Sequence, residues 1–299
     1  MIRTAEAEGR LKPGSVLVEA TSGNTGVGLS MAAAVRGYGM VITMTKKMAY
    51  EKEVAMTALG AKVIRTPTSV PSDHPDSLFG VANRLVKEKG YVMLDQYNNS
   101  ANPQAHYDGT AMEIYDQCDG KVDMVVSAAG TGGTVSGISR RLKELLPNIT
   151  IVGADPVGSL LADPEHDKVS PFLVEGIGYD FVPKVCERNR VDRWVKVNDK
   201  ESFEVALELS SLEGLMVGGS SGSALAAALK AAKDLREDQR CVVILPDTLR
   251  NYLGKFADKN WMIEHGLLEG EVTRPSYEVL ENQVDELKKR LAKYETPSE

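Results

Sequence analysis

Short apolar runs alternate with amphipathic segments along most of the chain. The apolar runs suit strands buried in a sheet, and the segments between them carry apolar residues at helical spacing. This alternation predicts βαβ units, parallel sheets with helices on both faces and therefore an α/β fold. Strands are expected at residues 16–19, 40–45, 62–65, 124–127, 150–153, 193–197 and 242–245. Helices are expected at residues 25–36, 52–59, 76–89, 103–118, 134–145, 200–212 and 223–235.

A turn-rich stretch at residues 98–103, Asn-Asn-Ser-Ala-Asn-Pro, separates the first group of strands from the second. We therefore expect two lobes, a smaller one at residues 1–103 and a larger one at residues 104–270. Residues 271–299 have another pattern, because apolar side chains recur there at the spacing of an amphipathic helix. Such a C-terminal helix would pack on its own domain or contact a partner chain. Its apolar positions are Leu280, Val284, Leu287, Leu291 and Tyr294.

Composition narrows the class of protein. The 299 residues are 42% hydrophobic and 26% charged, with a net charge of −7, which argues against nucleic acid or an anionic membrane as the main partner. No apolar run is long enough to span a bilayer. Three widely spaced cysteines give no disulfide framework, so we expect a reducing, cytoplasmic environment. The four histidines show no metal-ligand spacing, and no metal is expected.

The hexapeptide at residues 21–26, Thr-Ser-Gly-Asn-Thr-Gly, lies between the first expected strand and a helix of small residues. A turn of this kind presents backbone N–H groups and small hydroxyls at a helix N-terminus, where an anion is stabilised. An amino acid carboxylate or a phosphate would suit it. The alternative is a purely structural turn in which Ser and Thr cap the helix.

Two further Gly-rich turns follow later strands, at residues 130–134 and 218–223. The first, Gly-Thr-Gly-Gly-Thr, offers several N–H groups and two hydroxyls to one phosphate. It is not a Walker A loop, and Val135 stands where a dinucleotide fingerprint needs its third glycine. A structural turn and a nucleotide site remain alternatives. If the three turns meet in one cleft, they suit a phosphorylated aromatic cofactor that holds an amino acid.

Taken together, these strings and several others resemble the fold type II pyridoxal-phosphate enzymes, the two-lobed fold of the tryptophan synthase β type. Within that family the chain is similar to the β-synthases that join serine to homocysteine. The O-acetylserine sulfhydrylases, or cysteine synthases, are the alternative within the family. The resemblance covers about residues 1–270 and rests on residues 21–26, 94–97, 102–103, 106–108, 118–121, 130–134, 175–180, 218–223 and 244–252.

The resemblance implies pyridoxal 5'-phosphate as cofactor, without haem. Asn24 would hydrogen-bond the phenolic oxygen of the cofactor ring. Ser220 would face the pyridine nitrogen, and a neutral hydroxyl there does not enforce a protonated ring. The cofactor phosphate would lie on Gly130, Thr131, Gly132, Gly133 and Thr134.

The resemblance also implies how substrates are held. Tyr97 would line the pocket near the leaving group. The substrate α-carboxylate would be held by Thr21, Ser22, Thr25 and Gln96, and a loop over the second substrate would contain Gly176, Ile177, Gly178 and Tyr179. The implied reaction is β-replacement that condenses L-serine with homocysteine to cystathionine, a lyase-type step of transsulfuration and cysteine biosynthesis. The implied assembly is a homodimer, or association with a full-length homologue.

One residue of the family pattern has no counterpart. The family's Schiff-base lysine lies in a Ser-x-Lys-Asp-Arg-like segment well upstream of the position of Asn24. We interpret Lys12, Lys46 and Lys47 as loop lysines that do not replace it. We therefore expect that the chain begins after that segment, lacks the catalytic lysine and is inactive alone. Three hypotheses follow. The chain is a truncated enzyme, a non-catalytic sensor or partner subunit, or a nucleotide-dependent α/β enzyme.

Overall fold

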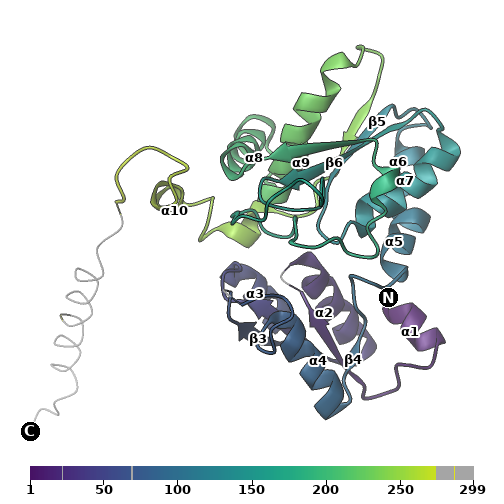
Figure 1. Ribbon diagram of the computed structural model, residues 1–299, viewed down its shortest axis with the longest axis vertical. Coiled ribbons are helices and arrows are strands. Elements are labelled where there is room, and N and C mark those ends of the chain that lie inside the picture. Colours follow the sequence, from purple (N-terminus) through teal and green to yellow (C-terminus); the bar gives the residue numbers. More distant parts are fainter. Residues whose placement is uncertain (22, 69, 274–285, 287–299) are drawn as a thin grey trace, which may run out of the picture. The chain divides into compact units, whose positions relative to one another are not determined.

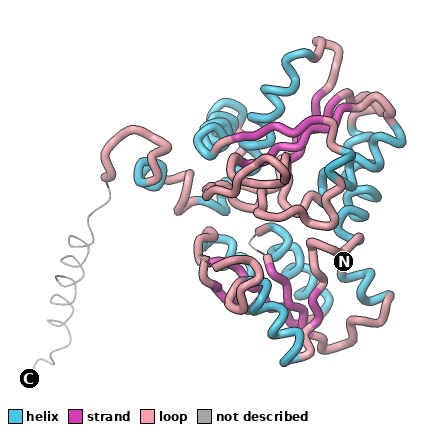
Figure 2. The backbone as a smooth tube through the Cα atoms, in the orientation of Figure 1, coloured by secondary structure: helices cyan, strands magenta, loops and turns pink. Residues whose placement is uncertain are grey.

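The computed structural model describes residues 1–21, 23–68, 70–273 and 286, and the chain divides into two compact units, Met1–Gly254 and Lys255–Glu299. In the described part of the first unit, eight strands form two four-stranded parallel sheets (Figures 1 and 2). We call the region of the first sheet the N-terminal lobe and that of the second the C-terminal lobe. The expected α/β fold with parallel sheets is confirmed.

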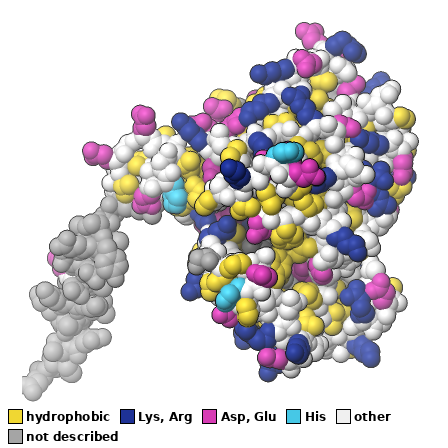
Figure 3. Space-filling model, viewed as in Figure 1, with side chains coloured by type: hydrophobic (Ala, Val, Ile, Leu, Met, Phe, Trp, Pro, Cys, Tyr) yellow, Lys and Arg dark blue, Asp and Glu magenta, His cyan; other side chains and the backbone are white. Residues whose placement is uncertain are grey.

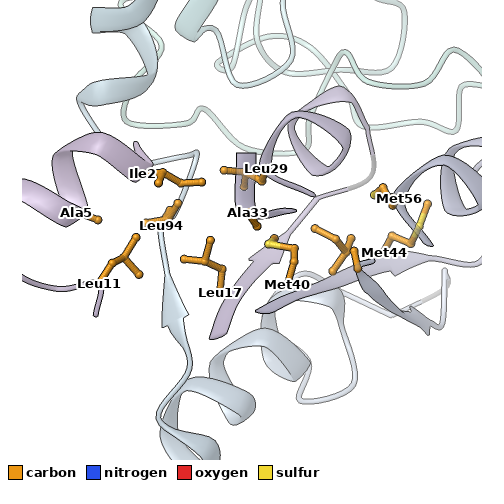
Figure 4. Packing of buried hydrophobic residues seen from close by; sticks show 12 residues of the cluster. Ile2, Ala5, Leu11, Leu17, Leu29, Ala33, Met40, Met44, Met56 and Leu94 are labelled. Atoms are coloured by element: carbon orange, nitrogen blue, oxygen red, sulfur yellow. The ribbon is translucent and has the colours of Figure 1, made fainter. Parts of the chain in front are cut away.

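The sheet of the N-terminal lobe has the order β3-β2-β1-β4. Its side chains alternate between two cores: Leu17 packs with α1, α2 and α3, whereas its neighbour Val18 packs with α4 on the other face. Figure 4 shows Leu17, Met40 and Met44 pointing to the same side of the sheet as Leu29 and Met56. The elements are α1 (Ile2–Ala7), β1 (Val16–Ala20), α2 (Asn24–Arg36), β2 (Gly39–Thr45), α3 (Tyr50–Ala58), β3 (Lys62–Thr66), α4 (Leu78–Lys89) and β4 (Val92–Met93).

The sheet of the C-terminal lobe repeats this arrangement with the order β7-β6-β5-β8. Val125 packs with α6 and α7 on one face, and Met124 and Val126 pack with α9 on the other. The elements are α5 (Ala101–Ala105), a π-helical turn (His106–Thr110), α6 (Ala111–Gln117), β5 (Met124–Ala128), α7 (Gly133–Leu145), β6 (Thr150–Pro156), β7 (Arg193–Val197), α8 (Asp199–Glu213), α9 (Gly219–Ala231) and β8 (Cys241–Val243). Short 3-10 turns lie at Arg188–Arg190, Ala232–Asp234 and Leu249–Tyr252.

The strand order places a topological switch point in each sheet. In the N-terminal lobe the chain runs outward from β1 to β2 and β3 and returns to the other side of β1 as β4. In the C-terminal lobe β5 and β8 hold the same relation. Open parallel sheets bind ligands outside the carboxyl ends of the strands at such points. The segments that follow β1, β4, β5 and β8 are therefore the places to look for a site.

Helices α1 and α10 were not among the expected elements, and three further differences concern the segments around the two sheets. The helix expected at residues 103–118 runs from α5 through the π-helical turn His106–Thr110 into α6. The helix expected from residue 223 begins at Gly219, because small residues allow its first turn to approach α8 closely: a Cβ on Gly222 would overlap the Ser202 carbonyl oxygen. Strand β4 is only two residues long, too short for its hydrophobic pattern to be recognised.

Helix α10 (Lys259–Glu264) belongs to the second unit, where Trp261 stacks on His265 with ring centroids 4.0 Å apart. Residues 274–285 and 287–299 lie outside the described residues, and so does most of the C-terminal helix expected at 271–299. The division at residues 103 and 104 stays a prediction, although strands β1–β4 and β5–β8 lie on either side of it. Among the described residues, no helix has both the length and the apolar character needed to cross a membrane. On the face seen in Figure 3, basic and acidic side chains are interspersed.

Candidate functional site

A cavity of about 750 Å³ lies at the carboxyl ends of β1, β4, β5 and β8. Thr21 and Asn24 line it after β1, Gln96 and Tyr97 after β4, and Pro246 after β8. Ala128 lines it at the end of β5 and residues 130–132 after that strand, and Ser220 lies in the first turn of α9. The three Gly-rich turns predicted to meet in one cleft therefore do meet. The described lining residues include no arginine and one lysine, Lys47, whereas N–H groups and hydroxyls that can bind an anion are numerous.

The turn at residues 130–134 has no room for a side chain at any of its three glycines. A Cβ on Gly130 would overlap the Gly176 carbonyl oxygen, one on Gly132 the sulfur of Cys186, and one on Gly133 the Asn102 amide. Gly132 also has a φ of +79°, which glycine adopts without strain. The backbone N–H groups are thus carried close to the cavity at the N-terminus of α7. Gly130, Thr131, Gly132 and Thr134 line the cavity, whereas Gly133 does not.

Two side chains that sequence reasoning left without a role hold this turn. Asn102 Nδ2 donates to Thr131 Oγ1 at 3.1 Å and to the Gln96 carbonyl oxygen at 2.8 Å, so it ties the turn to the segment after β4. Thr134 Oγ1 lies 3.1 Å from His106 Nε2, and His106 Nδ1 lies 3.0 Å from Thr110 Oγ1. Burial lowers the pKa of His106, which keeps its ring neutral near pH 7. Both residues stood in strings of the family resemblance, which was the one signal available.

In the first turn Gly23 has room for a Cβ, whereas a Cβ on Gly26 would overlap the sulfur of Met56. Thr21 is buried, and its Oγ1 accepts from the Gly23 N–H at 3.3 Å. Asn24 and Thr25 begin α2 and line the cavity. Ser22 lies outside the described residues. The N-terminus of α2 thus presents a hydroxyl, an amide and N–H groups to one place, which suits a carboxylate.

The segment after β4 is fixed by a buried carboxylate. Glu19 Oε1 accepts from the Gln96 N–H at 2.9 Å, and Glu19 Oε2 accepts from the Asp95 N–H at 3.0 Å. Burial raises the pKa of Glu19 to about 7, against the opposing effect of these hydrogen bonds. Gln96 Nε2 donates to the Ala20 carbonyl oxygen at 2.9 Å. Gln96 is therefore held by the end of β1 through both its backbone N–H and its side-chain amide.

Aromatic side chains from both lobes form one wall of the cavity. The Tyr97 and Tyr179 hydroxyl oxygens lie 3.1 Å apart, and their rings meet edge to face with centroids 5.4 Å apart. Burial raises the pKa of both phenols, so both are neutral near pH 7. Phe79 and Phe181 complete the cluster, and with Tyr97 they also line a second cavity of about 340 Å³.

The loop residues and the three lysines singled out from the sequence differ in their relation to the cavity. Gly176, Ile177, Gly178 and Tyr179 all line the cavity. Lys12 and Lys46 are exposed, and Lys47 is exposed at the cavity rim with its ammonium 5.7 Å from the centroid of the Phe172 ring. Lys47 is the one lysine among the described lining residues. No group of three or more metal-ligating side chains occurs among the described residues.

The chain matches known proteins along most of its length. The family model described as "Pyridoxal-phosphate dependent enzyme" matches residues 1–247. Cystathionine beta-synthase of Rattus norvegicus is 55% identical over 277 residues, which are 91% of this chain and 49% of the relative. Cystathionine beta-synthase of Dictyostelium discoideum is 51% identical over 96% of this chain and 57% of the relative. The chain spans about half the length of these curated relatives.

A solved structure supports the same fold. The crystal structure of O-ureido-L-serine synthase superposes with a TM-score of 0.80 at 33% sequence identity, covering 90% of this chain and 82% of that one. The expected two-lobed α/β fold of the pyridoxal-phosphate enzymes is therefore confirmed. The cavity fits such a cofactor, because the lining residues of the turn, Gly130, Thr131, Gly132 and Thr134, carry N–H groups and hydroxyls that suit a phosphate.

Proposed function

The chain belongs to the family of pyridoxal-phosphate dependent enzymes, and on this basis we propose that it carries out, as part of a β-synthase, the condensation of serine with homocysteine to cystathionine. The observation that carries the proposal is the convergence of three Gly/Ser/Thr turns on one cavity at the switch points of two sheets. Identities of 50–55% to proteins named cystathionine beta-synthase support the choice of reaction.

Each wall of the cavity has a proposed task. The N–H groups and hydroxyls of Gly130, Thr131, Gly132 and Thr134 would hold the cofactor phosphate. Asn24 would hydrogen-bond the ring's phenolic oxygen, and Ser220 would face the ring nitrogen. When bound, pyridoxal phosphate accepts electron density from the amino acid Cα, which makes loss of the α-proton and of a β-substituent feasible.

The substrate amino acid would bind on the N-terminal lobe. Its α-carboxylate would lie at the N-terminus of α2, where Thr21 and Thr25 supply hydroxyls and Gln96 an amide. The neutral phenols of Tyr97 and Tyr179 would face its β-substituent. Residues 176–179 would cover the second substrate and keep water away from the reacting carbon.

We propose that Lys12, Lys46 and Lys47 do not bind the cofactor aldehyde. Two of them are exposed away from the cavity lining, and the third lies at the rim beside Phe172. Reduction of the loaded chain with borohydride, followed by peptide mapping, tests this. A pyridoxyl group found stoichiometrically on any of the three would overturn this part of the proposal.

The reaction itself is tested by titrating pyridoxal phosphate into the full chain and then supplying serine and homocysteine. The chain should bind the cofactor at one site per chain. Cystathionine, detected by mass spectrometry, is expected from the chain extended at its N-terminus by a Ser-x-Lys-Asp-Arg segment. A folded, cofactor-loaded, extended protein that makes no cystathionine would contradict the proposal. Cysteine formed from O-acetylserine and sulfide instead would favour the alternative, a cysteine synthase.

We further propose a cytoplasmic protein that associates as a homodimer or with a longer homologue. The three cysteines, all within the described residues, are free, as suits a reducing compartment. Light scattering of the purified chain, alone and mixed with a longer relative, tests the association. A monomer in both samples would count against it, and would also remove the support for a non-catalytic partner subunit.

A further inference from the structure

We propose that Lys52 is a positioning residue of the cavity, acting through Glu175; the inference rests on the proposed cofactor site. Lys52 lies in α3 of the N-terminal lobe and is 1% exposed. Among the described residues it is the one lysine that is buried. Burying a charge is costly unless the charge is paired, so the partners of Lys52 must be held in place.

The partners of Lys52 come from the other lobe. Its Nζ donates to Glu175 Oε2 at 3.0 Å, and it lies 4.5 Å from the centroid of the Tyr252 ring. Glu175 Oε1 also accepts from the Ala49 N–H at 3.0 Å, at the N-terminus of α3. The carboxylate of the C-terminal lobe is thus bound by an ammonium and an amide of the N-terminal lobe. Glu51 adds a further link, because its Oε1 accepts from the Gly254 N–H at 2.7 Å.

Glu175 directly precedes Gly176, the loop residue that lies against both the first and the second Gly-rich turn. The next residue, Gly176, approaches Gly130 so closely that a Cβ on Gly130 would overlap its carbonyl oxygen. The Gly176 Cα also lies 3.8 Å from where a Cβ on Gly23 would stand. Two residues later, the Gly178 N–H donates to the Ala129 carbonyl oxygen at 2.9 Å. Fixing Glu175 therefore fixes the backbone that lies between the first and second turns.

A merely structural ion pair would stabilise the fold without setting the position of this loop. Two variants distinguish a role in stability from a role in positioning the loop. Lys52→Met removes the ammonium, keeps an unbranched apolar chain and leaves the Glu175 carboxylate buried. Adding Glu175→Gln removes the buried charge that has lost its ammonium partner, and a neutral amide oxygen can still accept from the Ala49 N–H. The double variant therefore restores stability without restoring the ionic contact.

Binding of pyridoxal phosphate to the full chain is the first measurement. We expect Lys52→Met to raise Kd about ten-fold, and the double variant to recover the thermal midpoint while keeping the weaker binding. Lys230→Met is the matched control, because it removes another lysine ion pair, to Glu201 at 2.7 Å, away from the cavity lining. Its Kd should stay within about two-fold of the wild type.

Hydrogen exchange is the second measurement, and it needs no ligand. In both Lys52 variants the amides of residues 175–179 should exchange faster, while those of β5 and β6 keep wild-type rates. Wild-type affinity in Lys52→Met, or recovery of both affinity and exchange in the double variant, would overturn the inference. Absence of cofactor binding by the wild-type chain would instead overturn the proposed function, and the exchange data would still test Lys52.

Discussion

The two lobes have the same strand order, but the Gly-rich turns proposed to bind anions are built in different ways. After β5 the turn consists of glycines so enclosed that a Cβ on Gly130, Gly132 or Gly133 would overlap a neighbour. After β1 the turn is open at Gly23, where the nearest atom to an added Cβ is 3.8 Å away, and side chains of Thr21 and Asn24 provide the polar groups. Backbone donors in a rigid turn suit a permanently bound phosphate, and side-chain donors suit a substrate that comes and goes.

A second difference lies one residue before the end of the central strands. Glu19 occupies this place in β1 and Ser127 in β5. Both are buried, but Glu19 is a titratable carboxylate that holds the segment after β4, whereas the Ser127 hydroxyl donates to the Ala128 carbonyl oxygen at 3.2 Å. The N-terminal lobe is therefore expected to respond to pH in a way that the C-terminal lobe does not.

The largest effect is expected when a methyl group is added to the glycine turn after β5, and the same change in the turn after β1 serves as the control. Gly130→Ala forces a Cβ into the Gly176 backbone, which cannot rotate away. We expect it to weaken binding of pyridoxal phosphate about a thousand-fold, a loss of roughly 4 kcal/mol. Gly23→Ala, with only an ordinary contact at 3.8 Å, is the control and should lose less than about ten-fold. Equal losses in a fluorescence titration would break the comparison between the turns.

The next effect concerns Glu19 and pH. Its pKa is raised from 4.5 to about 7, so the folded state holds a proton that the unfolded state releases as the pH rises from about 4.5 to 7. Unfolding free energy should therefore fall over this range, by up to roughly 3 kcal/mol from this group, and should level off above pH 7. Urea unfolding of wild type and Glu19→Gln at pH 5 and pH 8 measures it.

Glu19→Gln loses one of the two backbone acceptors but no longer titrates, so its stability should depend less on pH than that of the wild type. Hydrogen exchange can locate the effect. Amides of β1 and residues 95–97 should lose protection between pH 5 and pH 8, after correction for the intrinsic rate, and amides of β5 should not. An identical pH dependence in both proteins would show that Glu19 does not titrate in this range.

A smaller effect is expected where the two lobes are linked by Asn102. Asn102→Ala leaves the Gln96 carbonyl and the Thr131 hydroxyl without this donor, and should cost about 2 kcal/mol of unfolding free energy. It should also weaken cofactor and substrate binding together, since it contacts both sides of the cavity. Asn98→Ala removes an exposed bond to Asp95 and should cost less than about 0.5 kcal/mol. Weaker binding of only one ligand would contradict the linking role.

The smallest effect is expected from the phenol pair. Tyr97→Phe removes the hydroxyl that lies 3.1 Å from that of Tyr179, and should cost about 1 kcal/mol of stability. Tyr38→Phe, which loses a bond to Glu6 at 3.0 Å in the N-terminal lobe, is the control. If Tyr97 faces the β-substituent, Tyr97→Phe should slow cystathionine formation by the extended protein and Tyr38→Phe should not. Equal rates would leave the phenol pair with a packing role only.

Much of the fold follows from local pattern. The alternation of Leu17 and Val18, or of Met40, Val41 and Ile42, between two apolar surroundings already requires a sheet covered on both faces. Strand β4 could not be recognised because two residues are too few to show the alternation of apolar and polar side chains. The start of α9 was expected late because Gly and Ser are poor helix formers in isolation, and contact with α8 overrides that preference.

By itself, the sequence determined the α/β fold and the three turns, because hydrophobic period and Gly/Ser/Thr clusters are local properties of the chain. Three pairings depend on the folded arrangement: Asn102 joins Gln96 to Thr131, His106 contacts Thr134, and Lys52 binds Glu175. Lys52 and Glu175 are 123 positions apart in the chain. Local pattern cannot pair such residues, because the pairing depends on how two separately wound sheets bring their carboxyl ends together.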